Sequence, residues 1–241
     1  TNNLILDLLR RIIMADALRE LSQHTIKVFS ENADSSQSAP MSAYMRDKFP
    51  FLGIRSQDRR QLQKEIAEET GYAKEPFCEE FVRFLWGLPE REYQYFAVDY
   101  LINKSKTLAR DHIGLLRELI TQKSWWDTVD ALASNVVGLL CMKYPDIRHR
   151  EILQFSESGN IWLIRTAILF QLRYKNKTDT DLLADVIERH SETGEFFIDK
   201  AIGWALRQYA KTDGKWVLEF LSTHTLAPLS IREAEKHLKR I

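Results

Sequence analysis

The chain has 241 residues, of which 44% are hydrophobic, and its 34 Lys and Arg residues balance its 34 Asp and Glu residues. This length is sufficient to bury a substantial core, either in one domain or in a string of repeats that share one. The formal net charge is zero, whereas strongly basic nucleic-acid-binding domains have a pI above about 9. Any nucleic-acid surface must therefore come from local segregation of charge.

Cysteine content and hydropathy exclude several further classes of protein. Cys78 and Cys141 stand alone in apolar contexts, so we expect a reducing, cytoplasmic setting and no disulfide scaffold. No apolar run approaches the ~18 to 20 residues that span a bilayer, and residues 2–13 lack the cleavage pattern of a signal peptide. The histidines are scattered without partners at ligand spacing. We therefore expect no membrane insertion, no export, no metal and no cofactor.

The N-terminal segment differs from the rest of the chain. Residues 1–13 form either an additional helix or an extension ahead of Met14. Residues 32–40 (NADSSQSAP) are the one low-complexity stretch, which is typical of a flexible loop. We expect residues 1–40 to form an N-terminal helical extension and loop, and residues 41–241 to form the main domain.

Beyond residue 40, apolar residues recur at helical spacing almost throughout, as in Leu62 and Ile66 or Leu182 and Val186. No segment alternates with the period of a strand. Glycine and proline fall mostly between the apolar segments, as in residues 87–89 (GLP), where helix ends are expected. The pattern predicts an all-α protein.

Four segments of the chain resemble one another. They are residues 92–102 (EYQYFAVDYLI), 127–140 (DTVDALASNVVGLL), 160–172 (NIWLIRTAILFQL) and 195–206 (EFFIDKAIGWAL). Their alignment gives a period of about 35 residues and places Tyr95, Asp130, Arg165 and Lys200 at one register. Each period accommodates two helices and a short loop, as in HEAT-type repeats, although those are usually nearer ~40 residues. We predict a solenoid of stacked antiparallel helix pairs with a concave face.

Equivalent positions of successive repeats point the same way, so Asp130, Arg165 and Lys200 should form a row on one surface. Trp126 precedes Asp130 by four residues and Trp204 follows Lys200 by four, which places each indole one helical turn from the row. Core packing is the favoured explanation for either tryptophan taken alone, and Asp130 with Arg165 fits a structural salt bridge. An apolar core would not carry three charged residues in its register, however, so the combination favours a functional site.

Several longer strings carry a family resemblance. They are residues 44–54 (YMRDKFPFLGI), 86–94 (WGLPEREYQ), 123–130 (KSWWDTVD), 160–175 (NIWLIRTAILFQLRYK), 195–212 (EFFIDKAIGWALRQYAKT) and 226–239 (LAPLSIREAEKHLK). From about Met41 to Lys239 the chain closely resembles the AlkD-type DNA alkylation repair glycosylases. The resemblance implies HEAT-like helix pairs that cradle duplex DNA on the concave face. It also implies hydrolysis of the N-glycosidic bond of positively charged N3- and N7-alkylpurines, which leaves an abasic site.

The resemblance also implies roles for individual residues. It makes Asp130 the catalytic carboxylate, Arg165 its companion, and Trp126 and Trp204 the active-site indoles. It implies DNA-facing positions at Tyr44, Arg173, Arg207 and Lys211. The chain departs from the family near Gln57, where a proline is usual, and throughout residues 1–40.

Duplex DNA is the partner expected, with no obligate protein partner. The alternative is a non-catalytic HEAT-like scaffold that binds DNA or protein through the same surface, because fold does not imply function. The simultaneous presence of Trp126, Asp130, Arg165 and Trp204 favours the enzyme.

Overall fold

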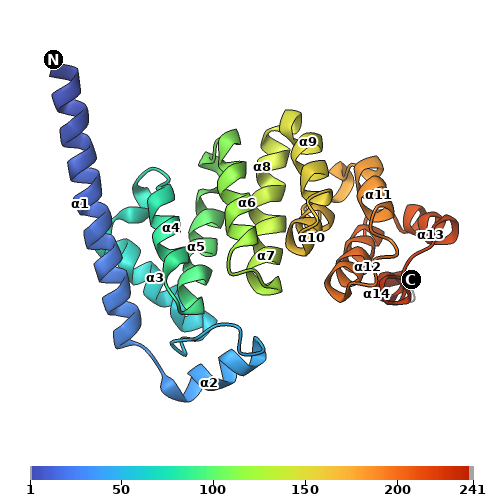
Figure 1. Ribbon diagram of the computed structural model, residues 1–241, viewed down its shortest axis with the longest axis horizontal. Coiled ribbons are helices and arrows are strands. Elements are labelled where there is room, and N and C mark those ends of the chain that lie inside the picture. Colours follow the sequence, from blue (N-terminus) through green and yellow to red (C-terminus); the bar gives the residue numbers. More distant parts are fainter. Residues whose placement is uncertain (1, 239–241) are drawn as a thin grey trace. The chain divides into compact units, whose positions relative to one another are not determined.

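The computed structural model describes the backbone of residues 2–238 and the side chains of residues 14–238. Its described part consists of helices joined by short loops and contains no strand (Figure 1). The prediction of an all-α protein is confirmed. Within the same residues, no helix combines the length and the apolar character needed to cross a membrane.

The chain divides into two compact units, Thr1–Asn103 and Lys104–Ile241. The first unit contains five α-helices and one 3₁₀ turn. They are α1 (Asn2–Glu31), α2 (Ser35–Tyr44), α3 (Ser56–Thr70), η1 (Tyr72–Lys74), α4 (Glu79–Gly87) and α5 (Arg91–Lys104).

The second unit contains the remaining helices and short turns of the described chain. They are η2 (Ser105–Thr107), η3 (Arg110–His112), α6 (Ile113–Thr121), α7 (Trp126–Leu132), η4 (Ala133–Val137), α8 (Gly138–Lys143), α9 (Pro145–Ser156), α10 (Ile161–Leu169), η5 (Lys175–Lys177), α11 (Thr180–Glu188), α12 (Phe196–Ala210), α13 (Gly214–Thr223) and α14 (Pro228–Leu238). The η4 segment is a π-helical turn that joins α7 and α8 into one continuous helix.

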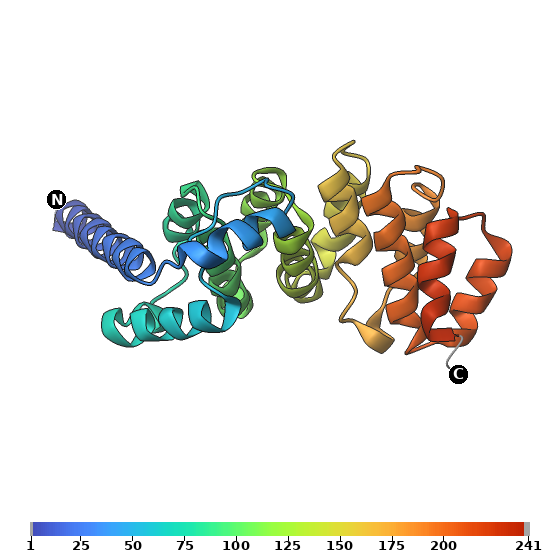
Figure 2. The same ribbon diagram turned by 90° about the horizontal axis from the view of Figure 1, so that it is seen from below.

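Helices of the second unit stack in pairs. The second helices of successive pairs, α7, α10, α12 and α14, begin at residues 126, 161, 196 and 228, which confirms the predicted period of about 35 residues. Helix α10 packs against α7 on one side and α12 on the other, and α12 packs most extensively against α14. Figure 2 shows α12 and α14 side by side. Each helix buries its apolar face against a neighbouring pair, as in helical-repeat folds.

Polar side chains set the starts of the repeat helices. Asn160 accepts hydrogen bonds from the backbone N–H groups of Trp162 and Leu163 at 2.9 and 3.2 Å. Asp179 and Asp213 cap α11 and α13 in the same way. These side chains satisfy N–H groups that have no partner within the helix. The residues that precede α10, α11 and α13 therefore define the first turns of these three helices.

In the first unit, a buried carboxylate holds the segment before α3. Glu92 is fully buried and accepts hydrogen bonds from the backbone N–H groups of Leu52, Gly53 and Ile54 at 3.0, 2.9 and 3.1 Å. Gly53 has a φ of 91°, and a Cβ there would lie 1.9 Å from the carbonyl oxygen of Asp34. Glycine is therefore required at this turn.

The structure corrects the expected loop at residues 32–40. Helix α2 begins at Ser35, so residues 35–40 are helical, with Pro40 inside the helix. The Asp34 carboxylate caps the helix by accepting from the N–H of Ser36 at 2.9 Å. Ser38 Oγ donates to the carbonyl oxygen of Phe51 at 2.5 Å. The cap and this tertiary contact stabilise a helix that the polar composition alone does not indicate.

A glycine allows α12 and α14 to approach closely. A Cβ at Gly203 would lie 2.4 Å from the Cβ of Glu233 and 2.7 Å from the carbonyl oxygen of Ser230. Such distances are below van der Waals contact, so any larger residue must separate the two helices.

We therefore expect Gly203→Ala to lower the free energy of unfolding by about 1–3 kcal/mol, because overpacking outweighs the gain in helix propensity. Gly114→Ala in α6 is the matched control, since a Cβ there meets nothing within 4 Å. Urea denaturation measures both variants. Equal stability of the two variants would show that α12 and α14 tolerate separation.

Candidate catalytic site

A carboxylate and a guanidinium from neighbouring repeats form a two-pronged ion pair. Arg165 on α10 donates through Nε to Asp130 Oδ1 at 2.7 Å and through Nη2 to Oδ2 at 2.8 Å. Its remaining terminal nitrogen, Nη1, donates to the carbonyl oxygen of Phe197 at 2.5 Å. Arg165 therefore connects α7, α10 and α12 through one side chain. The predicted juxtaposition of Asp130 and Arg165 is present.

Both partners are largely withdrawn from solvent. The Arg165 side chain is 7% exposed and that of Asp130 is 14% exposed. Burial raises the pKa of Asp130 above its ordinary value, although the hydrogen bonds and positive charge of Arg165 act in the opposite direction. The fork geometry of arginine matches a carboxylate. It leaves each oxygen of Asp130 with capacity to accept a further hydrogen bond.

The π-helical turn lies immediately after the site. Ser134 Oγ donates to the carbonyl oxygen of Asp130 at 3.1 Å, and Asn135 Nδ2 donates to that of Ala131 at 3.0 Å. The Asn135 side-chain oxygen accepts a hydrogen bond from Arg173. Such turns are frequent at functional sites because they redirect a helix face. Here the turn connects exposed Arg173, a predicted DNA-facing residue, to the helix that carries Asp130.

The tryptophans divide into core and partly exposed residues. Trp125 and Trp162 are buried and pack with Phe197 at centroid separations of 5.1 and 4.9 Å. By contrast, Trp126, at the start of α7, and Trp204 on α12 are only half-buried. Core packing therefore accounts for the first two indoles, whereas the two predicted site tryptophans retain accessible surface.

The aromatic cluster, which combines two buried indoles with a half-buried phenyl ring, was not predicted from the sequence. Its members, Trp125, Trp162 and Phe197, are separated by 37 and 35 residues, close to the repeat period. The Arg165 guanidinium lies 6.0 Å from the centroid of the Phe197 ring, so this cluster lies next to the ion pair. The periodic recurrence of aromatics one turn before the charged register was the available signal.

Lys200 forms a separate ion pair and does not extend the one between Asp130 and Arg165. Its Nζ donates instead to Glu233 Oε1 at 2.7 Å, and Arg207 Nη1 donates to Glu233 Oε2 at 2.6 Å. Glu233 lies on α14, 33 residues after Lys200 in the chain. The predicted row of Asp130, Arg165 and Lys200 is therefore divided into two separate ion pairs, because a carboxylate from the last repeat neutralises Lys200.

Glu233 is held in its charged form. Its side chain is 7% exposed, and Lys236 Nζ also donates to it at 2.6 Å. Burial acts to raise the pKa of Glu233, but the hydrogen bonds from Lys200, Lys236 and Arg207 outweigh it and lower the pKa to about 2. The carboxylate thereby fixes the two cations, Lys200 and Arg207, that flank Trp204 along α12.

The other predicted DNA-facing residues are exposed. Lys211 lies at the C-terminal end of α12, where its Nζ donates to Gln208 Oε1 at 2.8 Å. Tyr44 ends α2 in the first unit and is 72% exposed. Tyr95, the first member of the charged register, also belongs to the first unit. Its ring lies 4.9 Å from the Arg59 guanidinium, so at this register the first unit presents an aromatic residue in place of a carboxylate.

These features define a helical-repeat protein with a largely buried carboxylate–guanidinium pair and partly exposed indoles on α7 and α12. A sequence model of the DNA alkylation repair enzyme family matches residues 25–238. The chain belongs to this family, for which DNA is the substrate.

A solved structure shows the same similarity. A predicted DNA alkylation repair enzyme from Enterococcus faecalis is 34% identical to this chain, with a TM-score of 0.80. The match covers 87% of this chain and 98% of that one. No protein with a curated description matches the chain. The expectation of a DNA alkylation repair protein is confirmed at the level of the family.

We expect Glu233 to make stability depend on acidic pH. Its folded pKa of about 2 is depressed from the ordinary 4.5, so its contribution is present above pH 4.5 and is lost as the pH falls toward 2. A shift of this size corresponds to on the order of 3 kcal/mol. The difference in unfolding free energy between the wild type and Glu233→Gln should therefore shrink over this window in urea denaturation.

Glu219→Gln, which changes an exposed carboxylate on α13, is the control and should show no such dependence. A constant difference between the wild type and Glu233→Gln across the window would contradict the role of the three cations.

Proposed function

We propose that this protein is a monofunctional DNA glycosylase of the AlkD type, which hydrolyses the N-glycosidic bond of cationic N3- and N7-alkylpurines in duplex DNA. The observation that carries the proposal is the bidentate contact of Arg165 with Asp130 beside Trp126 and Trp204. A carboxylate held in this way can act on a developing positive charge, and the indoles retain surface for a substrate. The product is an abasic site in an intact strand.

Alkylation at N3 or N7 makes the purine cationic and a good leaving group, so no general acid is needed. The remaining task is to stabilise positive charge that develops on the deoxyribose as the bond to the base lengthens. Ionised Asp130 does this by proximity. It also accepts a proton from, or orients, the attacking water. Each carboxylate oxygen of Asp130 accepts one hydrogen bond from Arg165 and can accept a further one from that water.

Arg165 acts first as a positioning residue. Three of its nitrogens already donate to Asp130 and to the carbonyl oxygen of Phe197. Its hydrogen bonds favour the ionised carboxylate against the effect of burial. These contacts favour a role for Arg165 in holding Asp130 over a role in binding a phosphate of the DNA.

The indoles provide the second component of the site. The electron-rich faces of Trp126 and Trp204 attract a cationic base or sugar, with a contribution of order ~0.5 to 2 kcal/mol each. Their bulk also excludes stray water. Lys200 is unsuited to act as a nucleophile that forms a Schiff base with the sugar, because its ammonium group donates to Glu233.

Binding of the duplex is assigned to the exposed cations of the second unit and to Tyr44. Arg173 and Lys211 are exposed and can contact phosphates directly, while Arg207 is oriented by Glu233. Phosphate contacts position a protein on the duplex and carry no sequence information. We propose that the protein acts in the cytoplasm, in association with DNA.

The decisive test is Asp130→Asn. Its charge matters most in the transition state, so we expect loss of most base release, by about 100-fold or more, with duplex affinity nearly unchanged. Release of N7-methylguanine from methylated duplex measures the first quantity, and anisotropy of labelled duplex measures the second. A non-catalytic scaffold would release no base in either form, and an undiminished rate in the variant would remove Asp130 from its role.

The rate of base release should also depend on acidic pH. Burial raises the pKa of Asp130 above its ordinary 3.8, so activity should fall as the pH drops through this elevated pKa, where the carboxylate becomes protonated. In Arg165→Gln, the groups that lower this pKa are removed, so the acid limb should move to higher pH. Arg117→Gln on α6 is the control. An unchanged limb in Arg165→Gln would contradict the electrostatic coupling.

Substrate selectivity provides an independent test. The site contains one carboxylate and two indole faces, so it can assist a base that already departs easily. We expect release of N3-methyladenine and N7-methylguanine, and retention of uracil, 8-oxoguanine and hypoxanthine, in matched duplexes analysed by chromatography of the free bases. Robust release of uracil or hypoxanthine would require an acid or a base-reading pocket, and the mechanism above would then be wrong.

A further inference from the structure

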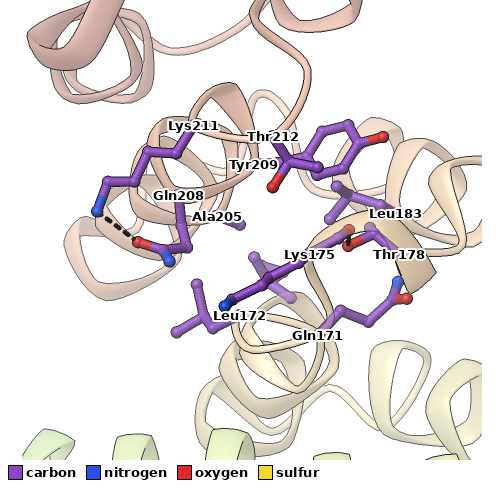
Figure 3. A pocket seen from close by; sticks show the side chains of 11 residues that line it. Gln171, Leu172, Lys175, Thr178, Leu183, Ala205, Gln208, Tyr209, Lys211 and Thr212 are labelled. Carbon is purple, nitrogen blue, oxygen red and sulfur yellow. Dashed lines mark hydrogen bonds between the residues drawn. The ribbon is translucent and has the colours of Figure 1, made fainter.

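A pocket of about 300 Å³ lies between the C-terminal parts of α10 and α12 (Figure 3). It begins one helical turn beyond Arg165 on α10 and directly after Trp204 on α12. None of the four predicted catalytic residues lines it, whereas the predicted DNA-facing residue Lys211 does. Its lining residues are Ile168, Gln171, Leu172, Lys175, Thr178, Leu183, Ala205, Gln208, Tyr209, Lys211 and Thr212.

The floor of the pocket is apolar. Ile168, Leu183 and Ala205 are buried, and Leu172 is half-buried. The half-buried ring of Tyr209 forms a wall and is held by an edge contact with Trp216 at a centroid distance of 5.4 Å. A flat organic group can therefore be covered on one side by aliphatic carbon and on another by an aromatic ring.

The rim carries positive charge. In Figure 3, the ammonium groups of Lys175 and Lys211 lie on the same side of the pocket as the Gln208 amide. Gln208 Oε1 accepts from Lys211 Nζ at 2.8 Å, which directs the amide nitrogen outward as a third donor. Among the eleven described lining residues, none is Asp or Glu. The pocket is therefore complementary to an anion.

The turn that presents Lys175 is fixed in place. Lys175 has a φ of 52°, a left-handed conformation that is uncommon for residues other than glycine and often occurs at functional sites. The Tyr174 hydroxyl is anchored on the carbonyl oxygen of Gly138 at 2.6 Å. Thr178 Oγ1 donates to the carbonyl oxygen of Lys175 at 2.7 Å. The position of this lysine is thereby set before any ligand arrives.

We propose that this pocket binds one nucleotide, with the phosphate at Lys175, Lys211 and Gln208 and the sugar and base over the apolar floor. Small-molecule pockets range over roughly 300–1,000 Å³, so this one suits a compact ligand. The ligand is either a free mononucleotide or one nucleotide of a bound DNA strand. The site goes beyond base excision, because binding here requires no bond cleavage.

Calorimetric titration with deoxyguanosine 5′-monophosphate tests the proposal, with deoxyguanosine and inorganic phosphate as the separate components. Methyl resonances of Leu172 and Leu183 locate the binding. The nucleotide should bind at least about tenfold more tightly than either component, since it combines charge-assisted hydrogen bonds with apolar contact. Equal affinities for nucleotide and inorganic phosphate, or no saturation at millimolar nucleotide, would overturn the proposal.

Variants separate the pocket from general positive charge. Lys175→Met with Lys211→Met should lower nucleotide affinity by about tenfold or more, because both ammonium groups would donate charge-assisted hydrogen bonds to the phosphate. Lys177→Met with Lys215→Met removes the same charge from two exposed lysines outside the lining and should have no such effect. An equal loss in both pairs would contradict a built site.

Competition identifies the source of the nucleotide. Displacement of the mononucleotide by undamaged duplex or single strand supports a nucleotide of the bound strand, and simultaneous binding supports a free mononucleotide. The titration is repeated with Asp130→Asn, which should bind the mononucleotide as the wild type does. Failure of base excision would therefore leave this result intact, and failure of nucleotide binding would leave the glycosylase proposal intact.

Discussion

The bidentate contact between Arg165 and Asp130 is the interaction on which the second unit and its site both depend. One guanidinium from α10 binds the carboxylate of α7 and the carbonyl oxygen of Phe197 at the start of α12. Both charged side chains are nearly buried, so each is tolerated only while the other is present. The same contact therefore stabilises the stack of repeats and holds a carboxylate beside two accessible indoles.

Charge along the repeat register is organised in pairs. Asp130 binds Arg165, and Lys200 binds Glu233, so each charged side chain is neutralised by one from a neighbouring repeat. The two buried carboxylates nevertheless differ in their environment. Asp130 receives one guanidinium, and burial still raises its pKa, whereas three cations lower the pKa of Glu233 to about 2. A carboxylate whose pKa is sensitive to its surroundings is suited to catalysis. A carboxylate that remains charged is suited to hold cations in position.

Close helix packing makes these contacts possible. Gly203 allows α14 to bring Glu233 against α12, and Gly138 allows the helix that follows Asp130 to approach the carbonyl oxygen of Phe170, which a Cβ would meet at 2.3 Å. The π-helical turn between α7 and α8 redirects the side chains after Asp130 and brings Asn135 to Arg173. Backbone geometry thus positions both the ion pair and the cations around it.

The sequence by itself determined the helical class, the repeat period and the shared register of Asp130 and Arg165, because these follow from apolar spacing and from the alignment of similar segments. It also identified the strings that place the chain in its family. The tertiary structure showed that the side chains of Asp130 and Arg165 bind each other. It decided which indoles are core, since Trp125 and Trp126 are adjacent in sequence, yet Trp125, the extended residue before α7, is buried and Trp126, the first residue of α7, is half-buried. It also decided that Lys200 binds Glu233, that residues 35–40 are helical, and that a pocket forms beside Lys175. Each of these depends on which surfaces meet when repeats pack, and local spacing along one chain does not contain that information.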